Sequence, residues 1–164
     1  MKLIRIFKIA PLFILVSCVF LGFKLQPEIS KYKCMIQMKN YTGEGAYIVI
    51  SLLNPEGFYE KTLYVQGDDE EWYFDIYEWW QFQGKVRHDI DAITGATISG
   101  GARAISIIEI ENIKLDKGYK IRFESAVEDQ DYFKDDVEFE LTSETIKSKI
   151  EGNGFIRYIR MIPQ

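Results

Sequence analysis

Segments in which apolar and polar side chains alternate recur along the chain, and they constrain its fold more than any other feature of the sequence. Successive side chains of a β-strand point to opposite faces of a sheet, so a period of two is typical of strands that bury one face. Turns rich in Gly, Pro and Asn, such as NYTGEG and NPEG, separate the first of these segments. The pattern predicts strands at residues 32–39, 46–53, 60–65, 102–111, 119–124, 137–141 and 155–162. We therefore expect a mainly β protein, an antiparallel β-sandwich of about seven strands.

One segment has a helical period instead. Residues 69–82 (DEEWYFDIYEWWQF) begin with acidic side chains, which favour the N-terminus of a helix. The apolar residues that follow at i, i+4, i+7 and i+8, the spacing of one helix face, are Trp72, Ile76, Trp79 and Trp80. We expect one short helix there, inserted between two strands, whose apolar stripe packs across an open end or an edge of the sandwich.

The first 23 residues have the layout of an export signal. Three positive charges, at Lys2, Arg5 and Lys8, precede the uncharged apolar run 9–23. Such a segment directs the rest of the chain out of the cytoplasm, so the domain that follows is expected to be extracytoplasmic, on the periplasmic side of the membrane.

Two fates of this export segment remain open. It could stay as a membrane-spanning signal anchor with its basic end in the cytoplasm, or residues 15–18 (LVSC) could act as a lipobox whose Cys18 becomes lipidated. In both cases the body is tethered to the membrane. Residues 24–31 then form a linker, and residues 32–164 form the folded β-sandwich domain.

The charge balance of the body excludes one class of partner. Residues 24–164 hold 17 basic and 25 acidic side chains, a net charge of −8. Affinity for nucleic acid depends on Lys and Arg side chains that neutralise phosphates. We therefore expect no nucleic acid among the partners of this protein.

The scarcity of histidine and cysteine excludes further chemistry. The only histidine is His88, and Cys34 is the only thiol after the export segment. One residue of each kind cannot supply a zinc or haem ligand set or a Cys–His nucleophile, so we expect no metal site and a buried Cys34 in a strand. The acidic residues between 128 and 136 lack the Gly and terminal Glu of an EF-hand loop and favour a solvated hairpin.

The most specific motif is the string DAITGAT at residues 91–97. It resembles the acceptor motif of flavin transferases of the ApbE type, in which the last Thr receives FMN from FAD through a phosphoester bond with the help of a divalent metal. The resemblance implies that Thr97 is the covalent attachment residue. The residues that it implies as the recognised sequence are Asp91, Thr94, Gly95 and Ala96. The chemistry agrees, because a hydroxyl that enters another protein's active site needs an exposed loop of small residues.

A wider resemblance covers most of residues 44–162. It rests on the heptad together with Lys61-Thr62-Leu63, Trp72, Tyr77, Trp79-Trp80 and Gly118-Tyr119-Lys120-Ile121, which leads into Glu124, Ala126 and Glu128. These residues resemble a family of predicted periplasmic proteins of unknown function that are encoded near flavin transferases and membrane reductase-like partners. The resemblance implies an immunoglobulin-like sandwich, with a flavin transferase and a membrane reductase or other redox protein as partners.

These observations lead to a functional expectation with one alternative. The leading hypothesis is that the protein is a membrane-tethered, extracytoplasmic electron carrier with covalent FMN on Thr97, rather than a stand-alone enzyme. Trp79 and Trp80 are candidate flavin contacts, because an isoalloxazine ring stacks well on indole, although aromatic residues at helical spacing more often form core. The alternative is an exported immunoglobulin-like module that binds a protein or a glycan through exposed aromatic residues and carries no cofactor.

Overall fold

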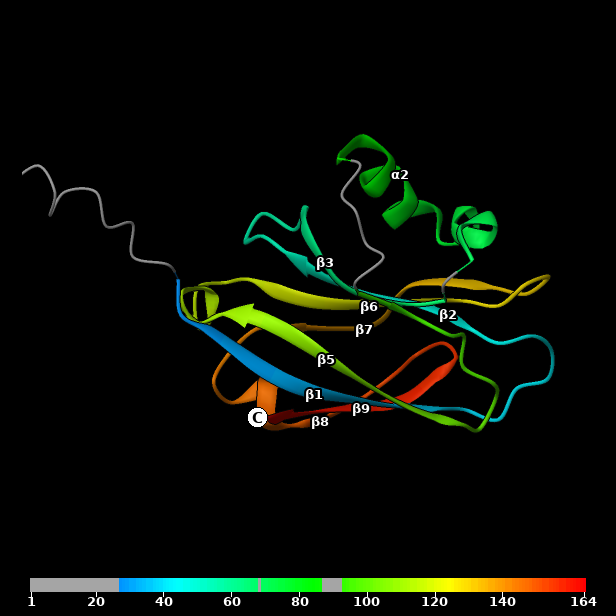
Figure 1. Ribbon diagram of the computed structural model, residues 1–164. Coiled ribbons are helices and arrows are strands. Elements are labelled where there is room, and N and C mark those ends of the chain that lie inside the picture. Colours follow the sequence, from blue (N-terminus) through cyan, green and yellow to red (C-terminus); the bar gives the residue numbers. More distant parts are fainter. Residues whose placement is uncertain (1–26, 68, 87–92) are drawn as a thin grey trace, which may run out of the picture.

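The computed structural model of the chain describes residues 27–67, 69–86 and 93–164 (Figure 1). Its strands are β1 (Ile29–Met38), β2 (Tyr47–Leu53), β3 (Tyr59–Gln66), β4 (Thr94–Gly95), β5 (Arg103–Glu111), β6 (Lys120–Ala126), β7 (Tyr132–Glu140), β8 (Lys149–Glu151) and β9 (Ile156–Pro163). The helical segments are η1 (Glu70–Asp75), α2 (Tyr77–Val86), η3 (Asn112–Lys114) and η4 (Thr145–Lys147). Two sheets face each other, in the strand orders β5-β1-β9-β8 and β4-β3-β2-β6-β7. The predicted mainly β sandwich is therefore confirmed.

Some predictions concern residues that the structure does not describe. The export segment 1–23 with Cys18, and also His88 and Asp91, lie outside the described residues. Within the described ranges, no helix combines the length and the apolar character that a membrane crossing requires. The predictions for the export segment therefore stay predictions.

The seven predicted strands are all present, with differences at their ends. β1 begins at Ile29, inside the predicted linker, because Ile29 and Lys31 already pair with Glu111 and Glu109 of β5. β7 begins at residue 132 rather than 137, because acidic residues in its first half hide the alternation. β4 and β8 have no counterpart in the prediction, since strands of two and three residues are too short to show a period of two.

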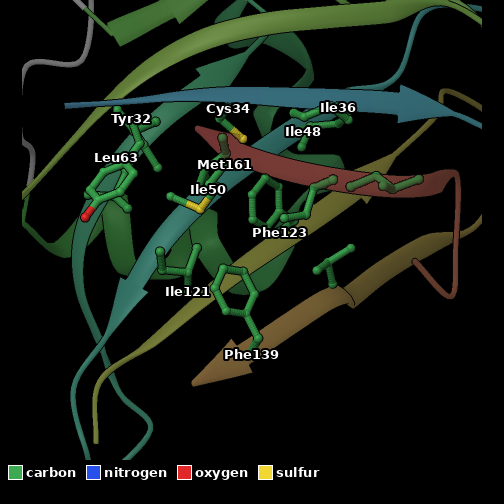
Figure 2. Close-up of a cluster of buried hydrophobic side chains, with 14 of the residues drawn as sticks. Tyr32, Cys34, Ile36, Ile48, Ile50, Leu63, Ile121, Phe123, Phe139 and Met161 are labelled. Carbon is green, nitrogen blue, oxygen red and sulfur yellow. The ribbon is translucent and has the colours of Figure 1, made fainter. Parts of the chain in front are cut away.

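The inner faces of the two sheets enclose the main core (Figure 2). The four-stranded sheet contributes Tyr32, Cys34, Ile36 and Met161, and the five-stranded sheet contributes Ile48, Ile50, Leu63, Ile121, Phe123 and Phe139. Cys34 is a free, fully buried thiol, as predicted, and burial raises its pKa to about 12. It therefore stays protonated and acts as a small packing residue.

The predicted helix at residues 69–82 consists of two helical segments. The first, η1, begins after Asp69, whose carboxylate accepts a hydrogen bond from the backbone N–H of Glu71 (3.1 Å). It ends at Asp75, and Ile76 takes a non-helical backbone conformation before α2 begins. α2 then continues to Val86, four residues beyond the predicted end.

These helical segments cover the outer face of the five-stranded sheet, as the position of α2 above β3 and β2 in Figure 1 shows. Tyr73, Ile76 and Trp79 form a second buried cluster with side chains of β2, β3 and β6. The expectation that the apolar stripe packs across an end or an edge of the sandwich was therefore wrong. The stripe covers a sheet face, and β2 is buried along its whole length as a result.

Asp136 of β7 ties the two sheets together. Its carboxylate accepts hydrogen bonds from the Ser125 hydroxyl (2.5 Å) and from the backbone N–H groups of Gly154 (2.6 Å) and Ile156 (2.8 Å). The side chain is fully buried, whereas Asp135 is exposed. The predicted solvated acidic hairpin is thus confirmed at Asp135 and wrong at Asp136, because three donors replace the water that a buried carboxylate would lose.

We predict that Asp136→Ala lowers the free energy of unfolding by about 3 kcal/mol, because it leaves three buried donors without an acceptor. Asp135→Ala is the matched control and changes the free energy of unfolding by less than about 0.5 kcal/mol. Urea unfolding of the two variants measures the difference. Equal stability of both variants would contradict the role of Asp136.

Candidate functional site

The described part of the heptad, residues 93–97, leads through a loop whose backbone is fixed on both sides. Before the loop, β4 adds an edge strand parallel to β3, with Val65 opposite Thr94. After it, Ile98 pairs with Ala46, which immediately precedes β2 (N···O distances of 2.8 and 3.1 Å). Thr97 therefore lies on a short span between two backbone anchor points.

Side chains beneath the loop bind its carbonyl groups. The Gln66 amide donates to the carbonyl of Ala96, and the Tyr41 hydroxyl donates to the carbonyl of Ile98. The Tyr41 hydroxyl also accepts a hydrogen bond from the N–H of Ala46 (2.8 Å). The loop shape is thus set by contacts with residues that precede β2 and that end β3.

Two glycines permit these close approaches. A Cβ atom on Gly95 would lie 2.6 Å from the Tyr64 hydroxyl oxygen, so a larger residue would require the Tyr64 side chain or the loop to move. A Cβ atom on Gly100 would lie 2.1 Å from the carbonyl oxygen of Tyr41, at the point where the chain crosses towards β5 in the other sheet. The fold itself therefore requires a glycine at position 100, where a Cβ atom would collide with backbone atoms.

The Thr97 side chain is exposed, and so is Ala96. Among the described residues, none forms a hydrogen bond with the Thr97 hydroxyl. Gly45 lies against it, and a Cβ atom at position 45 would come within 2.3 Å of Thr97 Oγ1. Thr97 is thus an exposed residue without a side-chain hydrogen bond among the described residues, and the segment next to its hydroxyl presents a glycine to it.

The two tryptophans differ in what they can offer to a ring. Trp79 is fully buried, and its indole N–H donates to the Thr62 hydroxyl (2.8 Å) while its ring contacts Tyr73 (5.2 Å between centroids). Trp80 is half-buried and also contacts the Tyr73 ring (5.6 Å). Trp79 is thus occupied within the protein, and only Trp80 keeps part of its surface accessible.

A buried carboxyl group to which the sequence analysis assigned no role lies beneath the helical segments. Glu124 of β6 has no solvent exposure, and its two oxygens accept hydrogen bonds from the hydroxyls of Tyr59 (2.7 Å) and Tyr132. Burial raises the pKa of Glu124 to about 7, against the opposing effect of the two hydrogen bonds. The alternation of β6 places Glu124 on the polar face, but the helical segments cover that face.

Aromatic and ionic contacts connect this carboxyl group to α2. The Tyr59 ring stacks on Phe82 of α2 (5.4 Å), and the Tyr132 ring contacts Tyr77 edge-on (5.7 Å). At the rim, Lys134 forms an ion pair with Glu78 of α2 (3.2 Å). On the sheet, Arg122 pairs with Glu138 (2.7 Å) and lies over the Tyr59 ring (5.5 Å). These contacts attach α2 to the five-stranded sheet.

The described residues contain no group of three or more His, Cys, Asp or Glu side chains placed to hold a metal ion. The Thr97 hydroxyl with its loop is the candidate site that the sequence motif indicates, and the Glu124 group lies beneath the helical cover.

We predict that the free energy of unfolding of the wild type falls between pH 5 and pH 8. The fall is larger than that of Glu124→Gln by about 2 kcal/mol. The carboxyl ionises near its ordinary pKa in the unfolded chain but only near pH 7 in the folded chain. The folded state therefore binds more protons in this interval, and the free energy of unfolding falls as the pH rises. Urea unfolding at both pH values measures the effect, with Glu140→Gln on the exposed part of β7 as the control. The same pH dependence in wild type and Glu124→Gln would contradict it.

Comparison with known proteins supplies the family. A family model described as "Predicted periplasmic protein (DUF2271)" matches residues 30–158, and the chain belongs to this family. The description agrees with an extracytoplasmic location and assigns no activity. Neither the curated proteins nor the solved structures that were compared give a match.

Proposed function

We propose that this member of the periplasmic family is an electron carrier that bears FMN, attached through a phosphoester bond to the Thr97 hydroxyl by an ApbE-type flavin transferase. The observation that carries the proposal is that Thr97 is an exposed residue whose hydroxyl forms no hydrogen bond with the described residues. It lies in a loop anchored at Thr94 and at Ile98. A substrate hydroxyl for another enzyme must meet these conditions.

In the proposed attachment, Thr97 Oγ1 attacks the FMN phosphorus of FAD. The new bond joins Thr97 Oγ1 to phosphorus, the phosphoanhydride bond breaks, and AMP leaves with the electron pair. The hydroxyl proton passes to a base of the transferase. The chain itself supplies the hydroxyl and keeps it accessible, because Gln66 and Tyr41 bind the backbone carbonyls on both sides of Thr97.

Bound FMN would supply one- and two-electron redox chemistry, and the protein would fix its position. The proposed redox partner is a membrane reductase, with the chain held near it by the export segment. The charge layout of residues 1–23 supports this tether. Trp80, with its partly accessible surface, remains a candidate neighbour for the ring.

A second candidate function is a binding module without cofactor. The observation that favours it is the exposure of Phe58 (69%), Phe74 (56%) and Tyr77 (50%), since large exposed aromatic side chains often mark contact surfaces. This alternative predicts a protein without flavin under all conditions of expression. The presence of a covalent flavin distinguishes the two.

We predict that the full chain, co-expressed with a flavin transferase, shows flavin fluorescence after denaturing electrophoresis and the mass increment of one FMN. Thr97→Ala abolishes both signals, because it removes the oxygen atom to which FMN is attached. Thr42→Ala, at an exposed threonine of a neighbouring loop, retains them. An increment that survives Thr97→Ala, or a wild type without any increment, would refute the proposal.

We also predict that Gly45→Ala slows flavin attachment at least several-fold while the protein remains folded. The added methyl group would occupy the space within 2.3 Å of Thr97 Oγ1 and force the hydroxyl to move. Gly84→Ala in α2 is the control, because a Cβ atom there meets nothing within 4 Å. The time course of fluorescence with purified transferase and FAD measures the rates. Equal rates for both variants would show that Gly45 does not limit access to Thr97.

A further inference from the structure

Within the described residues, β5 is an edge strand of the four-stranded sheet, and its backbone is regular along that edge. It is nine residues long, contains neither Pro nor Gly, and pairs with β1 without a register shift. Of the other edge strands in the described ranges, β4 and β8 have two and three residues, and β7 is interrupted by a register shift in its pairing with β6. A long, regular edge is a template for a further strand.

The hydrogen bonds at the ends of β5 show which backbone groups face this edge. Ala102 accepts from the N–H of Met38 (3.0 Å), and Asn112 donates to the carbonyl of Glu28 (2.8 Å). Backbone groups alternate between the two neighbours of an antiparallel strand, so the even-numbered residues of β5 bond to β1. The N–H and C=O groups of the odd-numbered residues 103–111 therefore point to the open edge.

The side chains of the same odd-numbered residues form a symmetric pattern on the outer face. Ile105 (57% exposed) and Ile107 (45% exposed) lie between Arg103 on one side and Glu109 on the other. The order basic, apolar, apolar, acidic is complementary to itself when it is reversed. It would fit an antiparallel copy of β5.

We propose that two copies of this chain pair through their β5 strands, antiparallel, about a two-fold axis at Ser106. In this register Ile105 lies opposite the partner's Ile107, and Arg103 lies opposite the partner's Glu109. Each pair occurs twice because of the symmetry. The two four-stranded sheets become one continuous sheet across the axis.

Ser106 supplies an independent reason for this register. Its side chain points inward and is 4% exposed, and its hydroxyl is buried without a hydrogen-bond partner among the described residues. At the axis it faces the partner's Ser106 in a pair without backbone hydrogen bonds, where Cα atoms lie about 4.5 Å apart and side chains adjoin. The two hydroxyls can then bond to each other, which removes an unsatisfied buried group from each copy.

A shift of the register by two residues fails both tests in either direction. With the axis at Ile105, Ser106 would face the partner's Ala104, and Ile107 would face the partner's Arg103. With the axis at Ile107, the hydroxyl of Ser106 would face the partner's Ile108 and stay unpaired, and Ile105 would face the partner's Glu109. The register centred on Ser106 also sets Ala104 against the partner's Ile108 on the inner face, a small side chain against a large one. The pattern of β5 therefore selects one register.

Disulfide formation between two tagged full-length copies in membranes tests this pairing. We expect a copy with Ile105→Cys to cross-link to a copy with Ile107→Cys, because opposite residues of a hydrogen-bonded pair have Cα atoms about 5.5 Å apart, which suits a disulfide. A mixture in which both copies carry Ile107→Cys reports the shifted register. The proposal is overturned if that product dominates, or if the mixed product does not exceed that of two copies with Glu140→Cys on β7.

Two further variants separate loss of pairing from loss of folding. Ile107→Pro removes an N–H that faces the open edge and not β1, so the protein should keep its unfolding midpoint while the detergent-solubilised full chain sediments as a monomer. Arg103→Glu should raise the dimer dissociation constant about tenfold, because it places like charges opposite each other, and Arg103→Glu with Glu109→Arg should restore it. A monomeric wild type, or a folded Ile107→Pro dimer, would overturn the proposal.

Discussion

Strand β2 is buried along both faces, so each of its two apolar faces needs another element of the fold to cover it. Ile48 and Ile50 face the four-stranded sheet, while Tyr47 and Val49 point outward and need a separate cover. Burial of a side chain of this size stabilises the folded state by about 1.5–3 kcal/mol relative to exposure. η1 and α2 supply the cover, and they enclose Glu124 as well.

The strands could be predicted because alternation is a local property of the sequence. Whether the polar face of a strand is exposed or buried could not be predicted, because it depends on which distant segment covers that face. Glu124 lies on the polar side of β6, as a solvated residue would, and becomes buried only because residues 70–86 pack over it. The same reason explains Asp136, whose donors include the backbone of Gly154 and Ile156 from the opposite sheet.

The candidate site could also be predicted only where the signal is local in the sequence. The exposure of Thr97 agrees with the expectation from a loop of small residues, since Gly95 and Ala96 give a local signal. Gly45 gave none, because nothing in the sequence relates position 45 to position 97 before the pairing of Ala46 with Ile98 is known. Helical spacing grouped Trp79 with Trp80, yet the first is core and the second is partly exposed, a distinction that periodicity cannot make.

The anchoring of the loop by long-range pairs has a consequence for the order in which the chain acquires its properties. Thr94 pairs with Val65, and Ile98 pairs with Ala46, so the conformation around Thr97 exists only after both distant segments have been brought together. Closing such intervals costs conformational entropy, and long-range β pairing is intrinsically slow. A newly exported, unfolded chain carries the same heptad without this geometry. The loop thus becomes a marker of completed folding, and any enzyme that recognises its shape would act on mature molecules alone.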